Sequence, residues 1–275
     1  MKRIYISDMD GTLLQSNGTL SEYTKQKINE FYEKGIPFSV ATARSMVSAK
    51  PLLEGVHFCA PIVLMNGVFV YDMENEKAVS YHEIPHSALK EIFEIFYENG
   101  LHPCLFLYGD DGLLSIKFTE LDNEVMEWFY NARVNMLDGR FTKTDDMTDI
   151  PQEQHPVYVN HFAPKEQLLP IAEKMKTVDD ISFAFYKDSY SDDWLIEIYS
   201  ATASKAQGAK ELAEYLGADH ITAFGDNLND IVMLKGADRA VAVDNAVDEV
   251  KSISHIVIGT NDNDSVVKFI DDENK

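Results

Sequence analysis

The stretch IYISDMDGT, residues 4–12, decides the fold, because a short apolar run ends in two aspartates, a glycine and a threonine. The run has the length and composition of a buried strand. Asp8 and Asp10 are two positions apart, so both side chains leave an extended backbone on the same side. Gly11 permits a tight turn after them. The stretch predicts a strand with paired carboxylates at its end, although aspartates that only cap the next element would look similar.

The composition indicates a globular protein of about two domains, since the chain has 275 residues, 45% of them hydrophobic. The formal net charge is −22, which repels nucleic-acid phosphates and anionic lipid, so we expect neither nucleic acid nor a membrane as partner. Cys59 and Cys104 lie outside any C-x-x-C arrangement and are predicted to be reduced. We find no signal peptide or membrane span and predict a cytoplasmic monomer or homodimer.

Strands and helices alternate at both ends of the chain, a pattern typical of a parallel sheet. The predicted strands there cover residues 3–7, 37–41, 61–65, 221–224, 240–243 and 256–258, with helices at 21–34, 204–216, 228–235, 246–252 and near Val266. The middle of the chain instead has helices at 85–99, 120–135 and 164–176, and hairpin-like strands at 102–108, 113–118, 157–162, 181–186 and 194–199. We therefore predict an α/β fold, a Rossmann-like parallel sheet with an inserted α+β domain. The predicted parts are 1–84 (core), 85–197 (inserted domain) and 198–275 (core).

Polar residues follow several predicted strands of the core, where ligands bind in open parallel sheets. Thr42 and Asn66 follow two of them, and the run GDNLND, residues 225–230, follows a third. Asp226 and Asp230, together with Asp8, supply the hard oxygen ligands that Mg²⁺ prefers. Taken alone, the run is also compatible with a plain turn in which an aspartate stabilises the first turn of a helix.

Three further residues have both an ordinary and a functional interpretation. Thr42 either caps a helix near Ser45 or, with the N–H of Ala43, binds phosphate at a helix N-terminus. Lys205 begins a predicted helix, where a cation is unfavourable beside the positive end of the helix dipole. This placement hints at a function, although a solvated surface lysine is the commoner explanation. Arg44 is either a surface cation or a substrate contact. A metal, two carboxylates, a lysine and a hydroxyl together describe phosphoryl transfer through an aspartyl-phosphate.

The four motifs DMDGT (8–12), TAR (42–44), SK (204–205) and GDNLND (225–230) resemble those of the haloacid dehalogenase superfamily. The position of the insertion resembles the Cof-type branch (subfamily IIB), which carries a C2B cap between the second and third motifs. Residues 241–246 and 260–266 resemble the tail of that branch. Ala43, Asp244 and Ser265 depart from it, because glycine is usual at these positions. The departures at Asp244 and Ser265 leave the geometry of the local turns undetermined.

The resemblance implies roles for individual residues. Asp8 would be the nucleophile, and Asp10 would be the general acid and then the general base. Mg²⁺ would be held by Asp8, the backbone carbonyl of Asp10 and Asp226. Asp230 would either bind the ion directly or contact one of its ligands. The phosphate oxygens would be bound by Lys205, Asn229, Thr42 and the backbone N–H groups of Met9, Asp10 and Ala43.

The implied function is that of a Mg²⁺-dependent phosphatase of small phosphorylated metabolites, with sugar phosphates as the leading class. A sugar-phosphate mutase or a disaccharide-phosphate phosphatase on the same core is an alternative. A non-catalytic phosphate-sensing or regulatory protein is another, although Asp10 would destroy a stable phosphoryl group. The substrate is not determined by the sequence. Candidate specificity groups in the inserted domain, most of which we expect to be ordinary solvated side chains, are Lys117, Arg133, Arg140, Lys143, His155, His161, Lys165 and Lys187.

Overall fold

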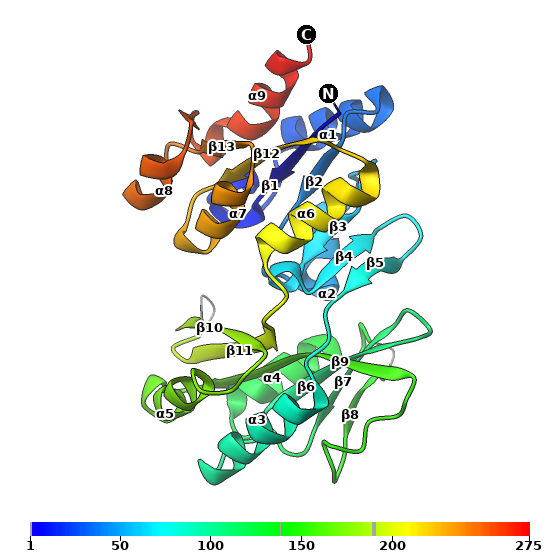
Figure 1. Cartoon of the computed structure of the whole chain (residues 1–275), viewed down its shortest axis with the longest axis vertical. Coiled ribbons are helices and arrows are strands. Elements are labelled where there is room, and N and C mark those ends of the chain that lie inside the picture. The colour runs from blue at the N-terminus through cyan, green and yellow to red at the C-terminus, as the bar shows by residue number, and fades with distance from the viewer. Residues whose placement is uncertain (1, 138, 189–190) are drawn as a thin grey trace. The chain divides into compact units, whose positions relative to one another are not determined.

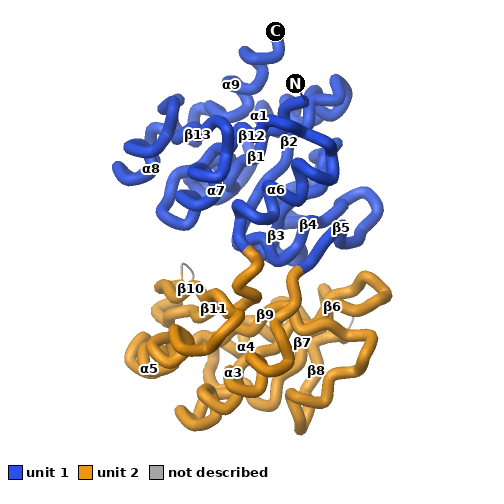
Figure 2. The backbone as a smooth tube through the Cα atoms, viewed as in Figure 1, with its two compact units in different colours: residues 1–81, 204–275 blue, residues 82–203 orange. Residues whose placement is uncertain are grey.

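The computed structural model describes residues 2–137, 139–188 and 191–275. The chain forms two compact units (Figure 2): unit 1 runs up to Tyr81 and resumes at Ser204, and unit 2 is His82–Ala203. Unit 2 extends beyond the predicted boundary at 197, because its last strand, β11 (Trp194–Ser200), continues past that point. No helix in the described ranges has the length and apolar character needed to cross a membrane.

Unit 1 contains a sheet of five parallel strands, as the alternation predicts (Figure 1). Their order is β14 (Ile256–Val257), β13 (Arg239–Ala242), β12 (His220–Gly225), β1 (Arg3–Ser7) and β2 (Phe38–Val40). Ser7 pairs with Phe224 on one side and with Val40 on the other, so the carboxyl ends of β1, β12 and β2 lie side by side. The segments that follow these three strands therefore begin at the same edge of the sheet.

Five of the described helices of unit 1 form two groups that cover opposite faces of the sheet (Figure 1). In the first, α1 (Glu22–Lys34) packs against α9 (Ser265–Glu273); in the second, α7 (Ile231–Gly236) contacts both α6 (Lys205–Leu216) and α8 (Asp248–Ile253). The sequence defines the ends of α6. The Ser204 side chain accepts the N–H of Gln207 at 3.0 Å, and Gly217 ends the helix with a left-handed φ of 61°.

A small second sheet continues unit 1 beyond β2, and the sequence predicted only the first of its strands. The predicted strand at 61–65 is β3 (Ile62–Leu64), which joins the parallel arrangement through a single bridge between Ala41 and Val63. It pairs instead with β4 (Phe69–Asp72), which pairs with β5 (Lys77–Tyr81), both antiparallel. The two additional strands were not predicted, because the turn before them places Met65 and Asn66, neither of them glycine, at positive φ.

Unit 2 is built on a six-stranded, mostly antiparallel sheet (Figure 1). The order is β10 (Ile181–Lys187), β11, β9 (Gln154–Ala163), β6 (Cys104–Gly109), β7 (Leu114–Phe118) and β8 (Phe141–Lys143). Only the described pair β7 and β8 is parallel. The short strand β8 was not predicted. The α+β character of this unit agrees with the fold class predicted for the insertion.

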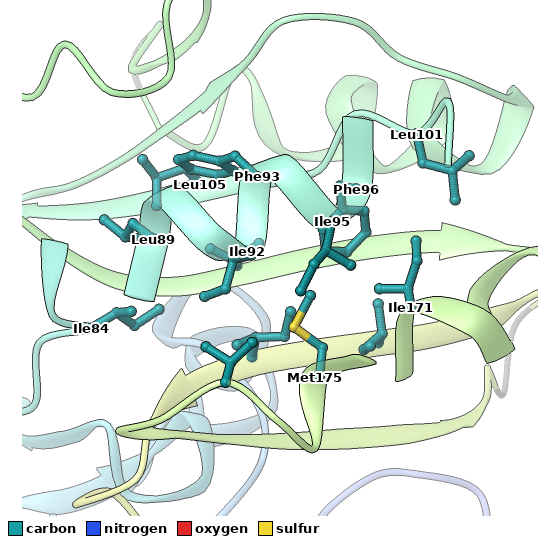
Figure 3. Packing of buried hydrophobic residues seen from close by; sticks show 14 of the residues in the cluster. Ile84, Leu89, Ile92, Phe93, Ile95, Phe96, Leu101, Leu105, Ile171 and Met175 are labelled. Carbon is teal, nitrogen blue, oxygen red and sulfur yellow. The ribbon is translucent and has the colours of Figure 1, made fainter. Parts of the chain in front are cut away.

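Helices cover both faces of the sheet in unit 2. On one face α3 (His86–Glu98) and α5 (Lys165–Met175) pack together over a hydrophobic cluster that includes Phe96, Leu105 and Ile171 (Figure 3). On the other face α4 (Glu124–Arg133) packs through Phe129 against Phe106, with ring centroids 6.3 Å apart. Leu105 and Phe106 are consecutive in β6, so their side chains necessarily point to opposite faces.

Candidate active site

The ends of β1 and β12 bring the two aspartate-rich motifs together. The N–H of Asp8 donates to the carbonyl of Phe224 at 3.0 Å, and the hydroxyl of Thr12 donates to Asp226 Oδ1 at 2.8 Å. Gly11, at a φ of +81°, lies between these contacts, and a Cβ there would be 2.4 Å from Asp226 Oδ2. Only glycine allows so close an approach. The turn predicted at Gly11 thus also sets the distance between the two motifs.

Three carboxylates form what we call the acidic cluster: Asp8, Asp226 and Asp230, each with one oxygen within 4.8 Å of the others. Lys205 Nζ donates to Asp8 Oδ1 at 2.5 Å and to Asp230 Oδ1 at 2.8 Å. The Lys205 side chain is only 3% exposed. Its interpretation as a solvated surface lysine is therefore wrong, and the ammonium lies inside the cluster.

Lys205 reaches the cluster because α6 begins against the turn at Gly67. A Cβ at Gly67 would lie 2.0 Å from the backbone oxygen of Ser204, and the φ of Gly67 is +93°. One turn later, a Cβ at Gly208 would lie 2.5 Å from Val63 Cγ1. These contacts leave no space for side chains, so they fix where the helix, and with it Lys205, begins.

The electrostatics of the acidic cluster favour a further cation. Burial raises the pKa of Asp8 to about 8, although Lys205 opposes this shift. Burial likewise raises the pKa of Asp226 to about 6, against the hydrogen bond from Thr12. Burial would lower the pKa of Lys205, but the carboxylates of Asp8 and Asp230 outweigh it and raise that pKa above its ordinary value. One ammonium does not balance three clustered carboxylates, so the donor set fits a divalent metal ion.

Asp230 differs from the other two members of the cluster, because protein groups occupy both of its oxygens. Oδ1 accepts from Lys205, and Oδ2 accepts the N–H groups of Asp226 and Asn227 at 3.1 and 3.2 Å. At Gly225 a Cβ would lie 2.7 Å from the Cβ of Asp230. Asp230 therefore holds the loop after β12 in the conformation that presents Asp226.

Asp10 lies outside the acidic cluster and pairs with Arg44. Arg44 Nε and one terminal nitrogen contact the two carboxylate oxygens of Asp10 at 2.8 and 2.6 Å. The Asp10 side chain is 52% exposed, whereas that of Arg44 is 22% exposed. The sequence left the role of Arg44 open and did not reveal this bidentate pair, because the two residues follow different strands.

The other predicted phosphate-binding residues differ in how deeply they are buried. Thr42 is buried and its hydroxyl accepts the N–H of Arg44 at 3.1 Å, which is a local turn and not the cap of α2 (Met46–Ala49). Ala43 is partly buried beside it, and the Met9 side chain is fully buried. Asn229 is exposed in the turn Leu228–Asp230.

Two asparagines missed as site residues brace the loop after β1. Asn245 donates to the carbonyl of Gly11 at 2.7 Å and accepts the N–H of Asn261 at 2.9 Å. Asn261 in turn donates to the carbonyl of Leu14 at 2.9 Å. The sequence did point to these two asparagines, because both lie in the tail segments after β13 and β14. The unusual Ser265 nearby is accommodated, since its hydroxyl donates to the carbonyl of Thr260 at 2.8 Å.

Comparisons with known proteins agree with this geometry. A model of the haloacid dehalogenase-like hydrolase family matches residues 5–270. The chain is 28% identical over 267 residues to a 5-amino-6-(5-phospho-D-ribitylamino)uracil phosphatase of Bacillus subtilis, covering 96% of this chain and 94% of the relative. It is 27% identical over 271 residues to a pyridoxal phosphate phosphatase of Escherichia coli, covering 98% and 97%.

Solved structures of the same fold cover the whole chain. A haloacid dehalogenase-like hydrolase from Bacteroides thetaiotaomicron matches with a TM-score of 0.77 at 22% identity, covering 99% of this chain and 100% of the other. A protein from Thermotoga maritima matches with a TM-score of 0.77 at 25% identity, covering 99% and 97%. The chain therefore belongs to the haloacid dehalogenase-like hydrolases and is a phosphatase that acts on phosphoric monoesters.

Proposed function

We propose that this protein is a Mg²⁺-dependent phosphatase of small phosphorylated metabolites, with sugar phosphates as the leading class, and that it acts through an aspartyl-phosphate on Asp8. The observation that carries the proposal is the position of Asp8 at the end of β1. Its carboxylate contacts Lys205 and lies within the acidic cluster. A buried, charge-compensated carboxylate is suited to nucleophilic attack on phosphorus.

In the proposed first step an oxygen of Asp8 attacks phosphorus and the bond to the substrate alcohol breaks. Asp8 Oδ1 accepts from Lys205, which leaves Oδ2 as the attacking atom. The ammonium of Lys205 reduces the repulsion between the carboxylate and the phosphate. The departing alkoxide takes a proton from Asp10, so an alcohol leaves and the phosphoryl group stays on Asp8.

In the second step a water molecule gives a proton to Asp10 and attacks the phosphorus of the aspartyl-phosphate. The acyl-phosphate bond breaks, inorganic phosphate leaves, and Asp8 is again a carboxylate. Asp10 is suited to carry this proton because it lies outside the acidic cluster, while its pair with Arg44 holds the carboxylate in place. Arg44 would thus act as a positioning residue.

The residues present fit a magnesium ion, because Mg²⁺ prefers oxygen ligands and the acidic cluster offers three carboxylates within 4.8 Å. Asp8, Asp226 and the backbone carbonyl of Asp10 would hold the ion, and Asp230 would act through the loop that it fixes. A bound Mg²⁺ supplies positive charge that neutralises the carboxylates and the phosphate. Lys205, Thr42, Asn229 and the N–H groups of Met9, Asp10 and Ala43 would bind the phosphate oxygens.

Hydrolysis of a generic aryl phosphate tests the reaction. We expect activity with Mg²⁺, loss of activity on chelation, and an inactive Asp8→Asn variant. Exchange of the exposed Asp219 for Asn provides a matched control that should remain active. In Asp10→Asn, mass spectrometry during turnover should show one phosphoryl group retained on the protein. Activity without metal or in Asp8→Asn would contradict the proposal.

The substrate class needs a separate comparison. The two named relatives act on a phosphoribitylamino-uracil and on pyridoxal phosphate, so both belong in a panel beside hexose and pentose phosphates. We expect the highest kcat/KM among the sugar phosphates. A higher value for either relative's substrate would replace the proposed class and leave the reaction unchanged.

A further inference from the structure

Three side chains of unit 2, those of His102, Glu120 and Asp122, converge beside its sheet, and His161 adjoins them through Asp122. We call these four residues the histidine cluster. His102 precedes β6, the two acids lie between β7 and α4, and His161 lies in β9. His102 Nδ1 is 2.7 Å from Asp122 Oδ1 and 3.7 Å from Glu120 Oε2. One ligand atom from each of these three residues lies within 4.8 Å of the others.

His161 is the unusual member of the cluster. Its side chain is 0% exposed and its ring lies against Phe96 of the hydrophobic cluster, with centroids 5.8 Å apart. Nδ1 is 3.1 Å from the carbonyl oxygen of His102, so this nitrogen must carry the hydrogen and donate it. In the neutral ring Nε2 is then the nitrogen with a lone pair, and it makes no hydrogen bond to the described part of the chain.

The unbonded Nε2 of His161 lies near the carboxylate of Asp122. The distance from Nε2 to Asp122 Oδ2 is 3.5 Å. Two electron-rich atoms this close together repel each other unless a proton or another positive charge lies between them. This arrangement indicates a ligand, because buried polar atoms are rarely left without a partner.

We propose that the histidine cluster is a transition-metal site best suited to Zn²⁺, with His102 Nδ1, His161 Nε2, Asp122 and Glu120 as its ligands. Imidazole nitrogens combined with carboxylates are a typical zinc donor set, and four ligands complete its usual coordination. His102 would carry its hydrogen on Nε2. The site is distinct from the acidic cluster of unit 1, which offers only carboxylate oxygens.

A structural histidine–aspartate pair is the simpler interpretation, and it accounts for only part of the geometry. Asp122 Oδ2 also accepts the backbone N–H of His102 at 2.6 Å, so a pair would explain Asp122 and His102. It would not explain why a fully buried imidazole turns an unpartnered nitrogen toward the same carboxylate. A metal ion would satisfy both residues and would tie β9 to the segments before β6 and α4.

Zinc binding by the metal-stripped full-length protein tests the proposal without using phosphatase activity. Calorimetric titration with ZnCl₂ in excess Mg²⁺ should show a tight site that His161→Ala removes and that Asp122→Asn weakens by at least about tenfold. Titration with Co²⁺ should give the visible absorption of a tetrahedral site in the native protein and not in His161→Ala. Circular dichroism establishes that each variant is folded.

His155 provides the matched control. It also contacts two carboxylates, but Nδ1 is 3.1 Å from Glu83 and Nε2 is 2.9 Å from Asp110, on different sides of the ring. One ion cannot be held by both pairs, so His155→Ala should bind zinc as the native protein does. Equal zinc stoichiometry and affinity in native protein and folded His161→Ala or Asp122→Asn would overturn the proposal. Because phosphate hydrolysis is not measured, this outcome is separate from a failure of the proposed function.

Discussion

The two units bury acidic side chains in different ways. In unit 1 the carboxylates of Asp8 and Asp230 share the buried ammonium of Lys205. In unit 2 Glu197 is buried to a similar degree, but the described side chains that act on its carboxyl group are those of Tyr158 and Tyr186. Burial raises the pKa of Glu197 to about 7, and the two tyrosines oppose the shift only in part.

The difference shows what a buried acid requires to remain charged. In unit 1 the ammonium of Lys205 opposes the cost of removing the carboxylates from water but does not cancel it, since the pKa of Asp8 stays raised to about 8. A further cation would be needed to keep these acids ionised as metal ligands and as a nucleophile. In unit 2 the groups that act on Glu197 are neutral hydroxyls, and its carboxyl group stays close to protonation near neutral pH. Unit 1 therefore combines three clustered carboxylates with one ammonium and leaves charge for a second cation to balance, whereas unit 2 buries a single acid close to its neutral form.

Removal of the cation from unit 1 should have the largest effect. In Lys205→Met the buried carboxylates lose their partner, and we expect the free energy of unfolding to fall by about 3–5 kcal/mol. The phosphatase kcat should fall by about 10²–10³-fold, because the ammonium no longer faces the phosphate. Lys210→Met, on the exposed face of the same helix, should change neither quantity measurably. Equal stability of the two variants would show that Lys205 does not compensate the cluster.

The close packing of α6 against Gly67, which positions Lys205, can be disrupted without removing the charge of Lys205. In Gly67→Ala the new Cβ would overlap the backbone of Ser204, so we expect a loss of about 2–4 kcal/mol in unfolding free energy together with lost activity. Gly35→Ala is the matched control, since Gly35 also has a positive φ, +65°, but has open space around the Cβ position. Backbone strain alone should cost about 1 kcal/mol there. Similar losses in both variants would exclude the steric explanation. Thermal and denaturant unfolding provide the measurement.

For unit 2 the comparison predicts a pH dependence. The folded state binds the Glu197 proton more tightly than the unfolded chain, because the pKa of Glu197 is raised from 4.5 to about 7. The stabilisation from this proton is fully present below the lower value and is lost as the pH rises through the higher one. Relative to Glu197→Gln, the native protein should therefore lose about 1–3 kcal/mol between acidic and mildly alkaline pH. Urea unfolding across this range tests the slope, and the exposed Glu127→Gln should leave it unchanged.

The smallest expected effect concerns an exposed charge pair. Arg44→Lys keeps the positive charge but loses the bidentate contact with Asp10, so we expect about a tenfold lower kcat with little change in KM. Slower decay of the phosphoenzyme in rapid-quench experiments would support this role. A raised KM at unchanged kcat would instead identify Arg44 as a substrate contact, the other role that the sequence leaves open.

The sequence predicted much of this architecture for identifiable reasons. Alternating apolar and helical segments predicted the parallel sheet of unit 1 and the α+β character of unit 2. The acidic residues at the ends of β1 and β12 were predicted to share one edge, and the structure brings Asp8, Asp226 and Asp230 together there. These inferences succeed because strand ends and turns are encoded by local patterns.

Contacts between distant segments were not predictable in the same way. The strands β4, β5 and β8 are short, and β4 follows a turn whose left-handed residues are not glycines. The burial of His161 was missed, because an isolated histidine in a strand usually belongs to the solvated surface. The pair between Asp10 and Arg44 depends on the adjacent ends of β1 and β2.

The sequence by itself determined the chemical groups of this protein and the order of most of the strands and helices that carry them. Tertiary structure alone decided which groups meet. Lys205 reaches Asp8 because α6 begins against Gly67, and His161 meets Asp122 because β9 passes beside the segment before α4. The physical reason is that local patterns fix backbone direction over a few residues, whereas charge compensation depends on the packing of segments that are far apart in the chain.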